Sequence, residues 1–230
     1  MVRIGGHLRR GRAIALPVAL LTLTAATVAS PASDAGASAP TAAEVLSRAQ
    51  SRMNGLKTYQ VPLTMSGSVK ISFVSVPFHM SGTEYYSAPN RHALHMDSVP
   101  SLARGFENTM ASMGGPKTWL ATYDIAVRGI APHGSHNAYV LFGTPRKPAN
   151  VKNVTLWISA KTYAVESVAF NYNNGATLNV DLGHRGYSPY QLPTHATVSA
   201  KFPQYAGQAQ VQYGTYQINA PVPDSVFQKQ

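Results

Sequence analysis

The stretch VESVAFNYNNGATLNVDL, residues 165–182, alternates apolar and polar side chains on both sides of an Asn-Gly pair. On an extended chain, one face would carry Val168, Phe170, Tyr172, Ala176, Leu178, Val180 and Leu182. Asn174-Gly175 is the favoured sequence of a two-residue type I′ connection between antiparallel strands. The stretch therefore predicts a β-hairpin with one apolar face and one polar face.

Other segments follow the same rule of alternation. Apolar residues occupy every second position in residues 59–65, 196–202 and 209–213. In residues 69–80 the apolar positions shift by one, from Val69 and Ile71 to Val74 and Val76, which predicts a bulge or a bend. One-sided alternation over so many segments predicts an antiparallel sheet with one face in water.

Two helices are predicted as the cover of the apolar face, because a single open sheet cannot bury that face alone. The first begins at Thr41, which forms a capping-box pattern with Glu44. The second spans residues 101–113, and Gly114-Gly115-Pro116 follows it. Its apolar residues recur at helical spacing, at Leu102, Phe106, Met110 and Met113. The fold class is thus α+β.

The first 40 residues have the pattern of a secretory signal peptide followed by a small-residue zone. A basic start is followed by an apolar run over residues 13–28 and then by ASPASDAGASA. We expect residues 41–230 to form one domain that is soluble and either periplasmic or extracellular. A retained N-terminal anchor is the alternative.

Composition narrows the class of partner. Residues 1–40 hold four of the 19 Lys and Arg and one of the nine Asp and Glu, which leaves 15 against 8 and a net charge of +7. The basic residues are scattered instead of forming the clustered stripe that nucleic-acid binding needs, so we expect no nucleic acid. The charge indicates attraction to anionic lipid or envelope polymer, or simply a solvated basic surface. With no cysteine, the chain can form neither a disulfide nor a lipid-modified N-terminal cysteine.

Reactive chemistry is sparse. His133 and His136 lie three residues apart in a predicted loop, but the nearest acid, Asp124, lies on a predicted strand. A metal site needs further ligands, so we expect exposed loop histidines with no metal, no cofactor and no catalytic residues. The protein is therefore not expected to be an enzyme.

Three segments, in this order, resemble the LolA-like lipoprotein-carrier superfamily. They are GTEYYSAPNRHALHM (82–96), LWISAKTYAVESVAFNYNNGATLNVDL (156–182) and YGTYQINAPVPDSVF (213–227). The first is similar to the family's strand–proline–strand segment, the second to its tryptophan-bearing strand and hairpin, and the third to its closing strand. The resemblance implies a strongly curved antiparallel half-barrel whose concave apolar face is covered by helices. It also implies that the protein carries or senses lipids and acylated proteins.

We therefore expect an exported carrier that binds acyl chains of a lipid or lipoprotein in a hydrophobic cavity. The candidate lid is Leu102, Phe106, Met110 and Met113, and the candidate wall is Phe170, Leu178, Val198 and Val211. The alternative for these eight side chains is a dry core without a cavity. Arg91 is the candidate for a headgroup or partner contact, or else a solvated turn residue.

The expected partners are a lipid or an acylated protein, together with envelope membrane proteins. The carrier is expected to act as a monomer. The rival function is an envelope sensor or scaffold module that uses the half-barrel for protein contact.

If the N-terminal pattern is a cleaved signal peptide, the mature chain should begin between Ser30 and Pro40. The intact mass of the protein recovered from its native envelope measures this directly. A full-length mass would contradict cleavage.

Overall fold

The computed structural model describes residues 39–89, 91–97, 116–184 and 190–228. The chain divides into two units, Met1–Ser38 and Ala39–Gln230, and every described residue belongs to the second. In chain order the elements are α1 (Ala42–Ser51), β1 (Thr58–Ile71), β2 (Val74–Ser87), β3 (Arg91–Met96), α3 (Pro116–Thr122), β4 (Tyr123–His133), β5 (His136–Pro145) and β6 (Val151–Ser159). They continue with β7 (Val165–Tyr172), β8 (Thr177–His184), β9 (Pro193–Lys201), β10 (Ala206–Tyr213), β11 (Gln217–Ile218) and the short 3₁₀ helix η2 (Asp224–Phe227).

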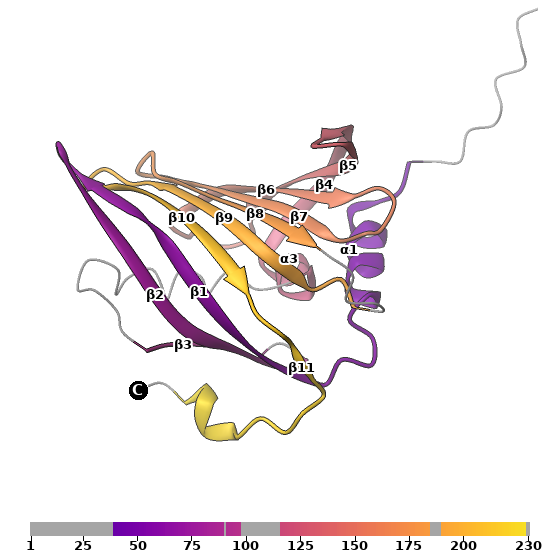
Figure 1. Ribbon diagram of the computed structural model, residues 1–230. Helices are drawn as coiled ribbons and strands as arrows, with labels where there is room; N and C mark the ends of the chain where they lie inside the picture. Colours follow the sequence, from indigo (N-terminus) through magenta and orange to yellow (C-terminus); the bar gives the residue numbers. More distant parts are fainter. Residues whose placement is uncertain (1–38, 90, 98–115, 185–189, 229–230) are drawn as a thin grey trace, which may run out of the picture. The chain divides into compact units, whose positions relative to one another are not determined.

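The strands form one antiparallel sheet of eleven strands, in the order β3-β2-β1-β10-β9-β8-β7-β6-β5-β4, with β11 paired to β1. The end strands β3 and β4 of this series do not pair with each other, so the sheet is open. Strand direction turns from β1 and β2 to β4 and β5 (Figure 1). The predicted antiparallel sheet is confirmed, and its curvature agrees with the predicted half-barrel.

The predicted hairpin around Asn174-Gly175 forms from β7 and β8, but the predicted two-residue type I′ connection is wrong. The Tyr172 N–H donates to the Ala176 carbonyl at 2.9 Å, which leaves the three residues 173–175 in the loop. Phe170 pairs with Leu178 across the two strands, and both side chains are buried. Gly175 has a φ of 80°, in the left-handed region that glycine adopts without a steric cost. Glycine at position 175 therefore fits the backbone conformation that the turn requires.

The phase shift within residues 69–80 is a hairpin turn, so the predicted bulge or bend is wrong. Ile71 ends β1 and pairs with Val74 at the start of β2. The two residues between them, Ser72 and Phe73, reverse the chain, and Ser72 has a φ of 55°. Because paired residues share a face, residues 71 and 74 lie on the same side although they are an odd number apart. That geometry produces the shift in the sequence pattern.

The segment 82–96 consists of the end of β2, a turn containing Pro89, and β3, as predicted. The Ala88–Pro89 peptide bond is cis. Tyr86 pairs with His92 and Glu84 with Leu94. This pairing brings an acid, a tyrosine and a histidine together near one edge of the sheet.

Helix α1 begins with the predicted capping box. The Thr41 N–H donates to the Glu44 carboxylate at 2.7 Å, and the Glu44 N–H donates to the Thr41 hydroxyl at 3.2 Å. The buried residues of α1, Ala42, Val45, Leu46 and Ala49, pack in one cluster with the inner side chains of the sheet. α1 is therefore part of the core and contacts α3.

Helix α3 was not predicted. Pro116, which the sequence pattern places after a helix end, is instead the first residue of α3. Proline is favoured there because the first helical N–H has no intrahelical partner. The predicted helix over residues 101–113 lies outside the described residues.

The core has two parts. The larger contains α1, Trp119 of α3 and the inner side chains of most strands. The smaller is rich in aromatic residues and consists of Leu56, Tyr59, Val61, Tyr86, Leu192 and Tyr216. Within the described parts of the chain, no helix is long and apolar enough to cross a membrane.

Replacing Gly175 by Ala should lower the free energy of unfolding by about 1–2 kcal/mol, because alanine is strained at this φ. Gly175→Asn should cost less, since Asn tolerates the left-handed region. A Cβ at Gly175 meets no atom within 4 Å, so the backbone alone sets the cost. Urea unfolding measures these differences. Gly207→Ala is the control, because a Cβ there meets ordinary contacts at 3.4 and 3.7 Å. Equal losses of stability at both glycines would contradict the conclusion that the φ of Gly175 sets the cost.

Candidate functional site

The four predicted wall residues lie on the inner face of the sheet, the face against which α1 packs. Phe170, Leu178, Val198 and Val211 come from the adjacent strands β7, β8, β9 and β10. Their side chains are 1–5% exposed and belong to the larger core cluster. The structure thus brings the predicted wall together as a packed surface. The predicted lid residues Leu102, Phe106, Met110 and Met113 lie outside the described residues.

Arg91 contacts the C-terminal segment of the same chain. Its guanidinium forms an ion pair with Asp224 at 2.7 Å and donates to the Ser87 hydroxyl at 3.0 Å. It also lies 4.6 Å from the centre of the Phe227 ring. An anionic headgroup at Arg91 would therefore have to compete with Asp224, and the contacts seen here attach η2 to β3.

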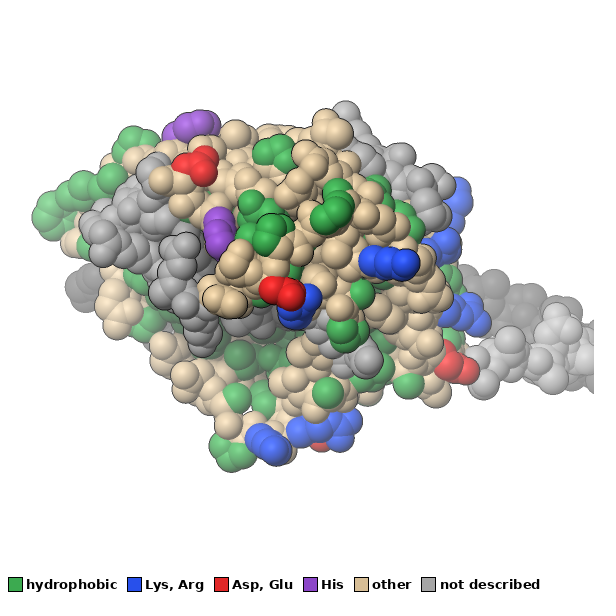
Figure 2. All heavy atoms as spheres, turned by 90° about the horizontal axis from the view of Figure 1, so that it is seen from below, with side chains coloured by type: hydrophobic (Ala, Val, Ile, Leu, Met, Phe, Trp, Pro, Cys, Tyr) green, Lys and Arg blue, Asp and Glu red, His purple; other side chains and the backbone are tan. Residues whose placement is uncertain are grey.

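A recess of about 160 Å³ opens on the inner face, and we call it the inner recess. Its lining comes from the end of α1, strands β1 to β3, β8 and the start of β9, and includes Met53, Tyr59, Tyr86, His92, Leu182 and His184. Pockets for small molecules usually measure about 300–1,000 Å³, so the inner recess can hold only part of a ligand. Figure 2 shows one side of this unit, where hydrophobic side chains lie among basic and acidic side chains.

The half-buried Glu84 and two buried tyrosines form a polar cluster beside the inner recess. The Tyr59 hydroxyl donates to Glu84 Oε1 at 2.5 Å, and the Tyr59 ring stacks on Tyr86 with centroids 5.2 Å apart. Burial raises the pKa of Glu84, and the hydrogen bond from Tyr59 opposes this only in part. Burial also lowers the pKa of His92, whose Nδ1 lies 4.0 Å from Glu84 Oε1. Both groups are therefore shifted toward their uncharged forms.

His184 presents an unsatisfied acceptor at the inner recess. Its Nε2 lies 2.8 Å from the Val165 carbonyl oxygen, so Nε2 carries the hydrogen. In the neutral ring, Nδ1 is then a bare acceptor, and this atom is buried with no hydrogen-bond partner in the described structure. A buried acceptor left unpaired is costly. A hydroxyl or amide donor on a ligand would remove that cost.

His133 and His136 lie at strand ends, not in a loop as predicted. They are the last residue of β4 and the first of β5, and they pair with each other across the turn. His136 Nε2 bonds to Glu166 of β7, an acid 30 residues away that no sequence motif indicates. His133 stacks on Trp157 at 5.9 Å. Across the ranges that the structure describes, no three side chains of His, Cys, Asp or Glu come close enough to hold a metal ion.

Comparison with known proteins identifies the fold. No family model matches the sequence, and no curated protein matches it significantly. The structure is similar to a protein of the DUF1329 family from Desulfovibrio piger, with a TM-score of 0.61 and 10% identity over 81% of this chain and 95% of the other. It is also similar to a LolA superfamily protein from Nitrosomonas europaea, with a TM-score of 0.53 and 13% identity over 83% and 99% of the two chains.

A third similar structure is a putative outer membrane lipoprotein-sorting protein domain from Vibrio parahaemolyticus. Its TM-score is 0.59 and its identity 12%, over 80% of this chain and 95% of that domain. Identities this low establish the fold alone. The chain therefore has the LolA-like fold, which confirms the predicted resemblance at the level of structure.

Glu84→Gln should become progressively more stable than the parent as the pH rises above about 4.3, the ordinary pKa of Glu. Because the pKa of Glu84 is raised in the folded state, the folded protein retains a proton that the unfolded chain has lost. Parent stability therefore falls between the unfolded and the folded pKa. A difference of one pH unit between the two pKa values is worth about 1.4 kcal/mol. Urea unfolding from pH 4 to pH 8 measures it.

The control is Glu44→Gln. Hydrogen bonds from Thr41 lower the pKa of the exposed Glu44, so its contribution to stability is present above the ordinary pKa and is lost as the pH falls. Glu44→Gln should therefore be less stable than the parent by a nearly constant amount above about pH 4.3, the range in which the advantage of Glu84→Gln grows with pH. A difference between Glu84→Gln and parent that does not change with pH would contradict the burial of this carboxyl.

Proposed function

We propose that the protein binds the acyl chain of a lipid or of an acylated protein on the inner face of its sheet and carries it within the cell envelope. One observation supports this most strongly: an open sheet presents an apolar inner face next to a recess lined by His184, which has an unsatisfied ring nitrogen. The likeness in fold to a lipoprotein-sorting domain agrees with this proposal. The proposal that the protein is exported is based on the signal-peptide pattern of residues 1–40.

Acyl binding needs no reaction, so the proposed protein is a carrier and not an enzyme. Each buried methylene contributes about 0.8 kcal/mol, so a single chain can offset the cost of association. The wall residues are already packed, and the inner recess is small. Chain binding therefore requires the cover to move away from the sheet. In this proposal, the predicted helix over residues 101–113 belongs to that cover.

The polar end of the ligand is proposed to remain at the inner recess. His184 Nδ1 accepts from a hydroxyl or amide hydrogen of the ligand. Arg52, which is exposed and lines the recess at the end of α1, supplies a positive charge for a carboxylate or phosphate. Glu84 and His92, shifted toward their uncharged forms, add polarity with little charge. This arrangement suits an acyl chain with a small polar end.

Leu182→Trp should weaken the binding of a fluorescent fatty acid by about tenfold or more. Leu182 is half-buried and lines the inner recess, and overpacking of such a site costs about 1–3 kcal/mol. Leu182→Met keeps the volume nearly constant and should bind as the parent does. Circular dichroism and thermal unfolding establish that both variants fold.

Two outcomes would count against the proposal. One is a folded Leu182→Trp that binds as tightly as Leu182→Met. The other is a parent protein that binds no fatty acid but retains a protein ligand from an envelope extract, which would favour the sensor or scaffold function.

A further inference from the structure

The β1–β2 hairpin ends in an exposed apolar tip. Phe73 in the turn is 91% exposed, and its neighbours Ile71, Val74 and Val76 are 36%, 52% and 37% exposed. The hairpin extends away from α1 to the opposite end of the sheet (Figure 1). A contiguous group of exposed apolar side chains marks an interaction site more often than scattered single residues do. We call residues 71–76 the hairpin tip.

The next hairpin, β9–β10, adds aromatic side chains to the same end. Lys70 pairs with Ala206 at the start of β10, so the turn before Ala206 lies beside the hairpin tip. In that turn Tyr205 is 39% exposed and stacks on Phe202 with ring centroids 4.9 Å apart. Tyrosine is enriched where an apolar body and a polar end meet a membrane–water interface.

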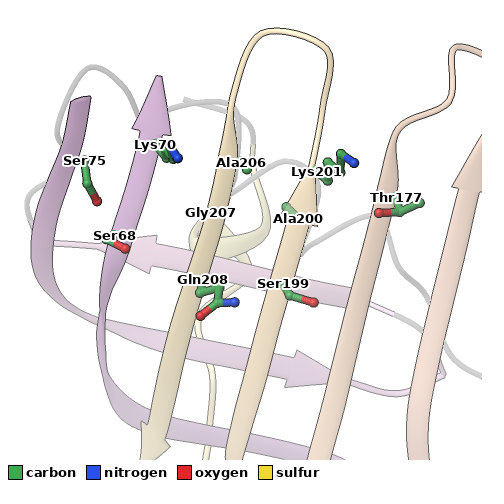
Figure 3. A pocket seen from close by; sticks show the side chains of 10 residues that line it. All are labelled: Ser68, Lys70, Ser75, Thr177, Ser199, Ala200, Lys201, Ala206, Gly207 and Gln208. Atoms are coloured by element: carbon green, nitrogen blue, oxygen red, sulfur yellow. The ribbon is translucent and has the colours of Figure 1, made fainter. Parts of the chain in front are cut away.

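The outer side of this end carries a polar groove of about 380 Å³. Lys70, Ala206, Lys201 and Thr177 form one row across β1, β10, β9 and β8. Because neighbouring strands lie about 4.8 Å apart, the two lysines flank Ala206 at a Cα separation of roughly 10 Å. Ser68, Ser199 and Gln208 line the groove in the next row (Figure 3).

The parts of the two hairpins near their turns lack carboxylates. Residues 58–83 and 182–223 contain no Asp and no Glu, and within the described residues Lys70 and Lys201 form no ion pair. The turns of these two hairpins therefore present positive charge without a paired carboxylate, beside an apolar tip. Charge of this sign is complementary to the anionic phospholipids of a membrane surface.

We propose that this end of the sheet docks on an anionic phospholipid membrane. Phe73 and the apolar residues beside it enter the interface, while Lys70 and Lys201 contact lipid phosphates from the groove. The arrangement matches peripheral membrane proteins, which combine a buried apolar surface with basic groups at headgroup depth. Docking would also join the membrane to the inner apolar face, because Val76 and Phe78 continue the tip toward the core. The docking itself does not depend on acyl binding in the inner recess.

Sedimentation with vesicles tests the docking. The parent should bind vesicles of phosphatidylglycerol and phosphatidylcholine more tightly than vesicles of phosphatidylcholine alone, and added salt should weaken that binding. Phe73→Ser should reduce binding about tenfold or more, since the transfer of a phenylalanine side chain from water is lost. The double variant Lys70→Glu, Lys201→Glu should lose about tenfold or more on the anionic vesicles.

Two control variants match these changes elsewhere on the surface. Ile130 of β4 is 57% exposed, and Ile130→Ser should bind vesicles as the parent does. Lys161 is exposed in the β6–β7 turn, and Lys161→Glu should have much less effect than the double lysine variant. Phe73→Ser should still bind fluorescent fatty acid, which separates this proposal from the proposed carrier function.

The docking proposal is overturned if Phe73→Ser binds vesicles like the parent, or if the parent binds neither kind of vesicle. It is also overturned if Phe73→Ser and Ile130→Ser lose binding equally, which would indicate nonspecific adsorption. Analytical ultracentrifugation tests whether the hairpin tip instead binds a second copy of this chain. A parent dimer that Phe73→Ser abolishes, without any vesicle binding, would assign the tip to a second copy of this chain.

Discussion

An open sheet with apolar side chains on one face must have that face covered, and this constraint governs the rest of the structure. A closed barrel or a second sheet would remove the problem, but β3 and β4 stay unpaired with each other. α1 accounts for part of the cover, with Val45 and Leu46 fully buried against the sheet. A cover made of helices can move without breaking the hydrogen bonds between strands. The proposed carrier function uses this property, because a cover that moves would expose the apolar face to an acyl chain.

The polar groups at the edge of this face follow from where the strands place them. Glu84 and Tyr59 lie on inner positions of β2 and β1, among apolar neighbours. Their mutual hydrogen bond satisfies both groups, while burial shifts Glu84 toward its neutral form. A carboxyl and an imidazole that are both shifted toward their uncharged forms lower the charge beside the inner recess and keep it polar. Such a site can bind a polar ligand end without the large desolvation cost of a buried ion pair.

The parts of the fold that could be predicted are those that depend on short-range patterns in the sequence. The capping box at Thr41 and the turn at Asn174-Gly175 each depend on a few adjacent residues, so the sequence alone revealed where they lie, although it did not give the length of the turn. The turn at Ser72 and Phe73 was missed because it uses neither glycine nor asparagine, and the sequence showed only the change of phase.

The polar contacts of the site could not be predicted, because they join residues distant in sequence. Tyr59 meets Glu84 across 25 residues and His136 meets Glu166 across 30. Such pairs depend on which residues face each other on neighbouring strands, and alternation in one sequence does not specify that register. The wall residues were found through alternation, since every inner position of adjacent strands shares one face. Alternation cannot distinguish a packed core from a surface that opens to a ligand.

Photoaffinity labelling with a fatty acid that carries a diazirine along its acyl chain tests the central claim most directly. Peptide mapping of the labelled protein would identify the residues in contact with the chain. We expect labels on inner-face positions of β1, β8, β9 and β10 and on the lining of the inner recess. These labels should decrease when unlabelled fatty acid competes. Labels confined to the outer face, or labels that competition does not reduce, would contradict binding of acyl chains on the inner face.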